Sequence, residues 1–292
     1  MKRKNERNVI VNEDYFNYLT KRLDEGIDNN LFVLETVNVI REELKRHNIV
    51  KVIDLGCFNG AMLNNILSKL DETERARIRA IGLDINKKVL ERGSIKYKDI
   101  IFIQGNLDLP LPLICQYHVL LLSNTSHELL TNNSNEQIVE FEKTLKRLIS
   151  ILQPHGKILF LDGVKPDENQ NLQVTFLNNN YERFHQFIKN YEIRKINFSE
   201  KNKKIYIDLI DLSAFFSKER YLETTYWEKE AKEIYQLFSR TEIMTVFKNC
   251  DLEINKQEIQ YYKKEYINSI IGDMEPKNEY IPKNIIVVAE KL

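Results

Sequence analysis

Two glycines and an aspartate stand together at the end of a short apolar run. The segment from Asp54 to Gly60 reads Asp-Leu-Gly-Cys-Phe-Asn-Gly. A glycine at a strand end lets the backbone approach a ligand, and a second glycine lets a helix begin without a side-chain clash. The N–H groups and positive dipole at that helix start then face the ligand. Phe58 stands between Gly56 and Gly60, so the spacing is not the G-x-G-x-x-G dinucleotide fingerprint, which argues against NAD.

The elements around this turn alternate between strand and helix. Short apolar runs, typical of buried parallel strands, occupy residues 50–55, 79–84, 100–104, 118–123 and 157–162. Residues 62–70 and 138–152 instead carry apolar residues at helical spacing. Ser134 and Gln137 form a capping-box signature for the second helix, and Pro154 predicts its end. The alternation predicts an α/β fold with a Rossmann-like, doubly wound sheet.

The glycine turn resembles motif I of the class I S-adenosylmethionine-dependent methyltransferases. That motif is an acidic residue, any residue, Gly, any residue, Gly, any residue, Gly. Asp54, Gly56 and Gly60 match it, and Phe58 replaces the middle glycine. The segment Leu-Gln-Pro-His-Gly that ends at Gly156 is similar to the superfamily's Leu-x-Pro-Gly-Gly turn, with His155 replacing one glycine. The resemblance implies a seven-stranded sheet with an antiparallel last strand, and S-adenosylmethionine as the cofactor.

Other segments of the superfamily follow in order over about residues 50–165. The resemblance implies that Asp84 accepts hydrogen bonds from the ribose hydroxyls, and that the turn containing Asn106 contacts adenine through its amide oxygen. Cofactor contacts are therefore expected from Asp54, Gly56, Cys57, Gly60, Asp84, Ile85, Asn106, Leu107 and Asn124. Alternatively, the turn needs glycine for geometry alone, Asp84 is a solvated carboxylate, and Asn124 bonds its own turn backbone. Cys57 lacks a basic neighbour in sequence and is not proposed as a nucleophile.

His127 follows the fourth strand, where the superfamily often places its catalytic group. A histidine near its ordinary pKa can accept the proton that a hydroxyl or amine loses on methylation. His127 is thus the candidate catalytic base, and the alternative is a helix cap. Candidate substrate contacts are Tyr18, Arg22, Glu128, Tyr226 and Trp227. Their alternatives are a solvated helix face for Tyr18 and Arg22, an ion pair for Glu128, and a satellite core for the two aromatic residues.

The rest of the chain predicts additions to this core. We expect an N-terminal helical extension over 1–48, the S-adenosylmethionine-binding core over 49–164, an inserted cap over 165–240, and the C-terminal part of the core sheet over 241–292. Within the cap, helices are expected over 181–191 and 225–238, with a hairpin made by 193–198 and 205–209. A helix capped by Thr241 and an antiparallel strand pair over 252–260 and 285–289 close the chain.

Composition narrows the class of protein. The 292 residues are 42% hydrophobic and 29% charged, which is typical of folded proteins. Lys plus Arg and Asp plus Glu both number 43, and this balance argues against a nucleic-acid partner. No apolar run approaches the roughly 20 residues that span a membrane, and the N-terminus lacks an apolar signal core. Three cysteines without a Cys-x-x-Cys pair predict neither disulfides nor a metal site, and favour a cytoplasmic location.

The resemblance implies transfer of a methyl group to an O or N atom of a small organic molecule or short peptide. Two alternatives stay open: a methyltransferase acting on protein or tRNA, and a non-catalytic partner protein that binds S-adenosylmethionine. A nicotinamide-dependent oxidoreductase is a weaker third. The sequence leaves open the substrate's identity, the attacked atom and whether the protein is a homodimer.

Overall fold

The computed structural model describes Tyr18, Lys21 and residues 30–109, 111, 116–129, 137–277 and 280–292. Arg22 and Ser134, which the sequence singles out, lie outside the described residues, as does most of the predicted N-terminal extension. The chain divides into two compact units. The first consists of the residues up to Ser123 together with Arg147–Leu159, and the second of Asn124–Lys146 together with Phe160–Leu292.

The main sheet is the Rossmann-like sheet that the sequence predicts. Its strands are β1 Val50–Leu55, β2 Ile78–Asp84, β3 Ile100–Gln104, β4 Tyr117–Ser123, β5 Leu152–Lys165, β10 Leu252–Tyr261 and β12 Pro282–Lys291. Their order is β10-β12-β5-β4-β1-β2-β3. β1 pairs in parallel with β2 and β4, and β2 with β3, while β12 is antiparallel to β10. The central strands are almost wholly apolar because they are buried on both faces.

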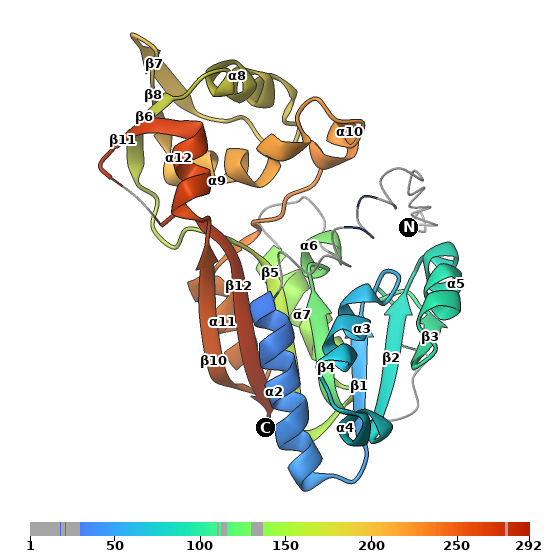
Figure 1. Cartoon of the computed structure of the whole chain (residues 1–292). Coiled ribbons are helices and arrows are strands. Elements are labelled where there is room, and N and C mark those ends of the chain that lie inside the picture. Colours follow the sequence, from blue (N-terminus) through green and yellow to red (C-terminus); the bar gives the residue numbers. More distant parts are fainter. Residues whose placement is uncertain are drawn as a thin grey trace, which may run out of the picture. The chain divides into compact units, whose positions relative to one another are not determined.

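Helices of the first unit pack beside these strands (Figure 1). They are α2 Asn30–Arg46, α3 Ala61–Ser68, α4 Glu72–Ala76 and α5 Lys87–Lys96. α2 buries one apolar stripe, which includes Phe32, Val37 and Ile40, against α3, β1 and β4. The short helix α4 begins with a full capping box, in which Asp71 and Glu74 each accept the other's backbone N–H.

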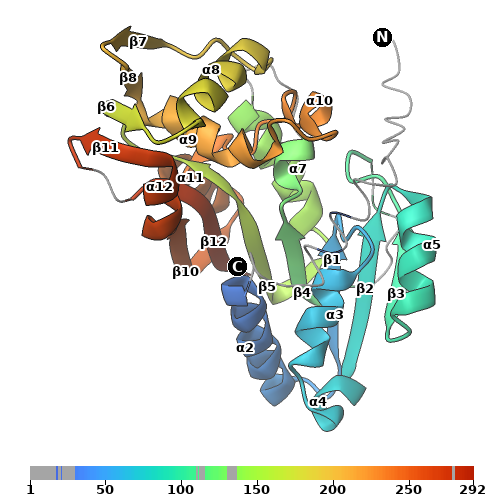
Figure 2. The same ribbon diagram turned by 45° about the horizontal axis from the view of Figure 1, so that its top comes forward.

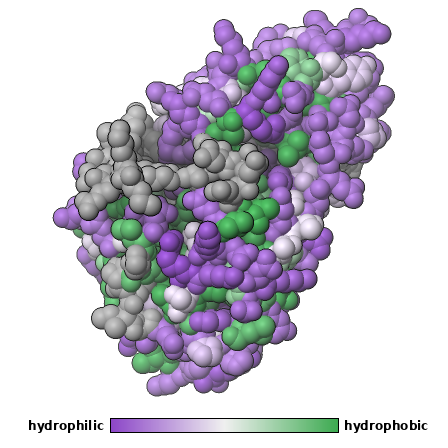
Figure 3. Space-filling view, turned by 180° about the vertical axis from the view of Figure 1, so that it is seen from behind, coloured by the Kyte–Doolittle hydropathy of each residue, from purple (hydrophilic) through white to green (hydrophobic). Residues whose placement is uncertain are grey.

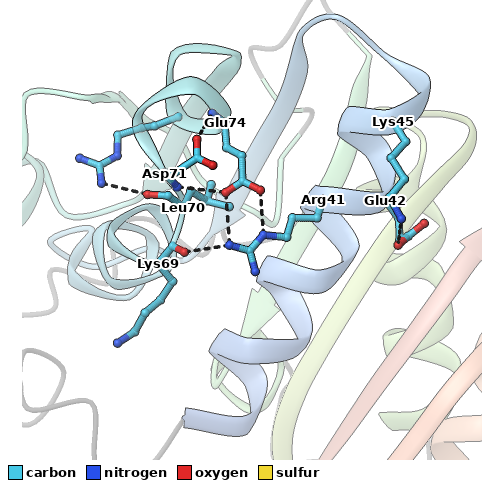
Figure 4. Close-up of polar contacts among 8 residues, drawn as sticks. Arg41, Glu42, Lys45, Lys69, Leu70, Asp71 and Glu74 are labelled. Carbon is cyan, nitrogen blue, oxygen red and sulfur yellow. Dashed lines mark hydrogen bonds and ion pairs between the residues drawn. The ribbon is translucent and has the colours of Figure 1, made fainter.

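An arginine joins α2 to the segment that leads into α4 (Figure 4). Arg41 Nε lies 2.8 Å from one carboxylate oxygen of Glu74, and a terminal nitrogen lies 3.2 Å from the other. The same terminal nitrogen donates to the Lys69 carbonyl at 3.2 Å. This bidentate contact adds little stability, because exposed ion pairs contribute only about 0–1 kcal/mol. Its main effect is to fix the relative direction of the two side chains.

The second unit contains a smaller antiparallel sheet that belongs to the cap. Its strands follow in the order β11-β6-β8-β7 and comprise β6 Asn171–Phe176, β7 Phe198–Lys201, β8 Lys204–Asp208 and β11 Ile271–Glu275. The cap's helical segments are α8 Asn180–Asn190, α9 Leu209–Lys218, the 3-10 turn η1 Glu219–Tyr221, α10 Trp227–Glu230 and α12 Lys264–Ile270. Figure 2 shows α8 and α9 beside this sheet. They share an apolar core with it that includes Phe184, Phe187, Phe215 and Phe216.

The other elements of this unit adjoin the end of β5. They are α6 Ser126–Leu129, α7 Gln137–Ile149, β9 Phe238–Ser239 and α11 Arg240–Asn249. β9 pairs in parallel with Val164–Lys165 of β5. The structure describes α7 from Gln137, and the helix ends at Ile149, before Pro154, because β5 already starts at Leu152.

Several sequence predictions for the second unit are wrong in detail. The predicted helix over 225–238 is only the four-residue α10, because the end of this segment pairs with β5 as β9. The first hairpin strand lies at 198–201 rather than 193–198. α11 is capped by Ser239, not Thr241, because the Ser239 hydroxyl accepts the Glu242 N–H. β11 pairs with β6, so residues 271–275 join the cap sheet rather than the core sheet.

The described surface is mostly hydrophilic on the face shown in Figure 3. Exposed large hydrophobic side chains occur on several elements of the described chain and include Leu34, Ile95, Ile101 and Leu292. Among the helices that the structure describes, none is long and apolar enough to cross a membrane.

Candidate active site

The turn between β1 and α3 is held against the end of β2. The N–H groups of Gly56 and Cys57 both donate to the Leu83 carbonyl, at 2.8 and 3.0 Å. Gly56 and Gly60 have φ of 77° and 81°, in the left-handed region that glycine adopts at little cost. A Cβ on Gly60 would also lie 2.6 Å from the Phe102 ring. Geometry thus explains why both positions are glycine.

Phe58 and His155, which replace glycines of the superfamily motifs, both adopt the backbone conformation that glycine favours. Their φ values are 52° and 63°. A left-handed residue with a Cβ costs about 1–2 kcal/mol, so the surrounding structure must hold it. For Phe58 one such contact is clear, because its N–H donates to Asp84 Oδ2 at 2.9 Å. The substitution of the middle glycine therefore keeps the path of the turn.

Asp84 is fixed by the backbone at the end of β2. In addition to the Phe58 N–H on Oδ2, its Oδ1 accepts the Asn86 N–H at 2.8 Å. Burial raises the pKa of Asp84, and the backbone hydrogen bonds partly oppose that rise. Each carboxylate oxygen has a second lone pair. Asp84 can therefore still accept a fork of two hydroxyl hydrogen bonds.

Asp54 and Cys57 lie beneath this turn and are both buried. The Asp54 residue is 2% exposed, and burial together with the charge of Asp84 raises its pKa to about 7. Burial also raises the pKa of the Cys57 thiol well above its usual value. A Cβ on Gly82 would lie only 2.7 Å from Cys57 Sγ, so the thiol packs into the space that the glycine leaves. The Cys57 side chain thus has a packing role, in agreement with the prediction that this thiol is not a nucleophile.

The predicted adenine side of the turn combines apolar and amide groups. Ile85 is 41% exposed although it follows a buried strand. Asn106 Oδ1 accepts the Asp108 N–H at 2.8 Å, so this oxygen keeps one lone pair for a further donor. Leu107 is buried, and its carbonyl accepts a hydrogen bond from the Arg147 guanidinium.

His127 lies in the second unit, on the short helix α6, and is paired with an aspartate of β5. Its Nδ1 is 2.7 Å from Asp162 Oδ1, and the two side chains are only 6% and 4% exposed. Asp162 also accepts the Ser126 hydroxyl, the Gly163 N–H at 2.8 Å and the His127 N–H at 3.3 Å. The aspartate is held firmly, and it in turn holds Nδ1 of the imidazole. This arrangement differs from the simple helix cap that the sequence allowed.

The electrostatics of His127 favour its charged form. Burial by itself lowers its pKa, but Asp162 raises it through its charge and hydrogen bond, and Glu128 and Glu233 add to the rise, so that the net pKa is raised. The bond to Asp162 places the neutral ring's proton on Nδ1, which leaves Nε2 as the proton acceptor. The edge of the Tyr235 ring also meets the imidazole, with ring centres 4.9 Å apart.

Other predicted residues have less specific settings. Asn124 is exposed with φ of 49°, and its N–H donates to the Leu161 carbonyl at 2.7 Å. Tyr18 and Tyr226 are half-buried, and Glu128 is exposed. Trp227 packs onto the cap core, with its ring 6.3 Å from that of Phe187. The aromatic residues of the cap are thus largely core residues, as the alternative interpretation held.

Sequence reasoning missed Asp162 and Tyr235. Asp162 directly follows the apolar residues Ile158–Leu161 near the end of β5, much as Asp54 and Asp84 follow apolar residues at or near the ends of β1 and β2. That repeated pattern is the one signal that could have found it. Nothing in the sequence marks Tyr235, because the chain there was expected to be helical.

The fold and the turn define a class I S-adenosylmethionine-dependent methyltransferase. Over residues 46–238 the chain matches the model of a family described as a methyltransferase domain, and it belongs to that family. A comparison with curated proteins gives no match.

Solved methyltransferase structures resemble the chain in fold at low sequence identity. The plantazolicin methyltransferase BpumL, solved with a pentazolic desmethyl analogue and S-adenosylhomocysteine, has a TM-score of 0.50 and 11% identity, covering 96% of this chain and 91% of its own. An S-adenosylmethionine-dependent methyltransferase from Clostridium acetobutylicum has a TM-score of 0.49 and 12% identity, covering 94% and 98%. A further S-adenosylmethionine-dependent methyltransferase, from Methanosarcina mazei, has a TM-score of 0.47 and 11% identity, and the match covers 84% of this chain and 94% of the other.

The residues present fit the cofactor. Asp84 offers free lone pairs to hydroxyl groups, Ile85 offers an exposed apolar side chain to a flat ring, and the turn at Gly56 brings the backbone within reach of a ligand. The two carboxyl groups of Asp54 and Asp84 at this turn are poor partners for a phosphate.

Proposed function

We propose that this methyltransferase transfers its methyl group to a hydroxyl or amine of a small organic molecule or short peptide, with His127 as the general base. The observation that carries the proposal is the buried His127–Asp162 pair at 2.7 Å. A histidine whose Nδ1 is held by a carboxylate keeps Nε2 free to accept a proton. That is the geometry required to remove a proton from an attacking O–H or N–H group.

The cofactor supplies a methyl group already activated by a positively charged sulfur. When bound, it would give this methyl group to the substrate oxygen or nitrogen and leave as S-adenosylhomocysteine, with the electron pair of the broken carbon–sulfur bond on sulfur. The proton of the attacking group passes to His127 Nε2. Asp162 stabilises the imidazolium that results, and solvent removes the proton between turnovers.

For cofactor binding, we assign Asp84 to the ribose hydroxyls and Ile85, Asn106 and Leu107 to the adenine. The support is the preserved turn, in which Phe58 and Asn86 orient the Asp84 carboxylate. Asp54, Gly56, Cys57 and Gly60 shape the backbone, and Asn124 remains a candidate cofactor contact.

For the substrate, we assign the cap, including residues 165–240, as the variable cover. Its separate apolar core around Phe187 and Phe215 supports this, because a cover that folds around its own core can vary without disturbing the cofactor turn. Tyr18, Arg22, Glu128, Tyr226 and Trp227 remain the candidate contacts.

The test has two stages. Calorimetric titration with S-adenosylmethionine, S-adenosylhomocysteine and NAD should show binding of the first two only. Transfer of a labelled methyl group is then screened on small hydroxyl and amine compounds, short peptides, a protein mixture and tRNA. A small compound or peptide should be labelled, and His127→Asn should lose about 10²–10⁴-fold in kcat while its affinity for the cofactor is unchanged. Labelling of tRNA or protein alone would overturn the substrate class, and an active His127→Asn would overturn the base.

A further inference from the structure

A buried ion pair lies near His127 in the second unit. Lys218 at the end of α9 and Glu230 at the end of α10 are 2.8 Å apart, between Nζ and Oε2. Their side chains are 1% and 0% exposed. Burying two charges costs about as much as their attraction returns, so such a pair is weak evidence of added stability. The pair calls for another explanation.

Tyr235 connects this ion pair to His127. Its hydroxyl donates to the same Glu230 Oε2 at 2.5 Å, and Lys218 Nζ lies 3.4 Å from the centre of its ring. Both the end and the face of the Tyr235 side chain are therefore held by buried charges. The ring then meets the His127 imidazole edge to face, at an interplanar angle of 73°.

The backbone of Tyr235 is fixed from the other side by β5. A Cβ on Gly163 would lie 2.3 Å from the Tyr235 carbonyl oxygen, a distance that only glycine permits. Gly163 directly follows Asp162, the partner of His127. Three residues later along the chain, Phe238 pairs with Val164. Tyr235 is thus anchored to the same strand that carries the aspartate.

We propose that Tyr235, clamped by Lys218 and Glu230, is a positioning residue that sets the orientation of the His127 ring. The inference rests on the proposed role of His127 as the base. One hydrogen bond to Asp162 fixes Nδ1 but lets the imidazole pivot about that bond. A rigid ring against the imidazole removes this freedom and so fixes the direction of Nε2. Misplacing a reacting group by about 1 Å can cost about 100-fold in rate.

The groups that act on the charge of His127 come from several elements. Asp162 lies on β5, Glu128 on α6, and Glu233 and Tyr235 on the segment after α10. Lys218 and Glu230 carry opposite charges, 2.8 Å apart, so their effects on the charge of His127 oppose each other. We therefore expect loss of the Tyr235 ring to act mainly through orientation.

The experiment compares Tyr235→Leu and Tyr235→Phe in the full chain. Histidine-labelled protein is titrated by NMR, and the His127 signals are assigned by their loss in His127→Asn. Tyr235→Leu should shift the His127 ring signals and its titration curve, because ring current and packing are lost, and should lower kcat by about 10- to 100-fold with an unchanged KM for the cofactor. Tyr235→Phe keeps the ring and should retain most of the activity.

Tyr191→Leu is the matched control. It also removes a buried tyrosine of the second unit, one that packs on Phe187 with ring centres 4.8 Å apart. It should lower thermal stability without moving the His127 signals. If Tyr235→Leu does not fold, the double variant Lys218→Met/Glu230→Gln removes both clamping charges and should move the same signals. Folded Tyr235→Leu or double variant with unchanged His127 signals would overturn the inference.

The two proposals fail separately. The NMR readout needs no substrate, so unchanged His127 signals and an unchanged titration curve would overturn the positioning role even when no acceptor has been found. Full turnover by His127→Asn would overturn the base, whatever the NMR shows. Normal kcat in Tyr235→Leu beside an inactive His127→Asn would overturn only the positioning role.

Discussion

Asp84 is the residue on which cofactor binding should depend most directly. Its carboxylate is oriented by two backbone N–H groups and keeps lone pairs for the ribose hydroxyls. Hydrogen bonds to a charged group contribute about 1.5–3 kcal/mol. We expect Asp84→Ala to weaken S-adenosylmethionine binding by about 10- to 100-fold, measured by calorimetry. Asp71→Ala, which removes the cap of α4 in the same unit, should leave the affinity unchanged, and equal losses in both variants would contradict the assignment.

The pH dependence of the reaction should report His127. A base acts in its neutral form, and the pKa of His127 is raised above 6.5, so kcat/KM should rise with pH through a limb centred above 6.5. Asp162→Asn removes the main cause of the rise, so the limb should move to lower pH while kcat falls. Rate–pH profiles of the two proteins check this, and a limb that stays in place would show that another group is titrating.

At this scale the sequence reveals the glycines and Asp84 because motif spacing within one strand–turn–helix unit is local. Phe58 could not be interpreted from sequence, since only the structure shows that it accepts a left-handed φ of 52°. His127 and Asp162 are 35 residues apart in sequence, and their contact depends on strand pairing. Tyr235 could not be found at all, because its role depends on three contacts from distant elements.

Among the elements, β5 and the segment before β9 approach each other closely at Gly163. Gly163→Ala would force a methyl group against the Tyr235 carbonyl, at 2.3 Å. Overpacking typically costs about 1–3 kcal/mol, so the free energy of unfolding should fall by about that amount, measured by urea denaturation. Gly272→Ala is the control, because its Cβ would meet the Leu177 side chain at 2.9 Å and the nearest backbone atom, the Thr175 carbonyl oxygen, only at 3.6 Å. Equal stability of the two variants would contradict the close approach.

The strands of the main sheet are predictable because a buried parallel strand is apolar throughout, and β1, β3 and β10 match their predicted bounds within a residue. The same reasoning fails for residues 225–238. Their helical periodicity predicts a helix, but the end of this segment pairs with β5 instead. β11 was missed because its sequence, Ile-Gly-Asp-Met-Glu, has only two buried residues. Local sequence pattern thus predicts the strands whose burial makes them apolar. It misses the elements that form only by pairing with a strand elsewhere in the chain.

For the whole molecule, ligand binding should appear as thermal stabilisation. A ligand at 100 times its Kd stabilises the native state by about 2.7 kcal/mol. We expect S-adenosylmethionine and S-adenosylhomocysteine to raise the unfolding temperature of the wild type, and Asp84→Ala to need more ligand for the same shift. NAD should have no effect. A shift with NAD alone would contradict the cofactor assignment.

The balanced charge of the whole chain predicts how methyl transfer responds to salt. With 43 basic and 43 acidic residues, the protein has no net field to attract a polyanion. For a small acceptor, KM between 50 and 200 mM salt should change by less than about twofold. A nucleic-acid acceptor that contacts several phosphates would instead lose about 10³–10⁵ in affinity over that range. Steady-state kinetics at both salt concentrations separate the two substrate classes.

The close approach at Gly163 also has an evolutionary consequence. A lineage that keeps the Asp162–His127 pair together with the tyrosine behind it cannot exchange Gly163 for any other residue without moving that tyrosine's backbone. An Asp-Gly pair near the end of the fifth strand, with a tyrosine shortly before β9 and α11, is therefore a diagnostic mark. It should separate methyltransferases that inherited this arrangement from those that share only the cofactor turn.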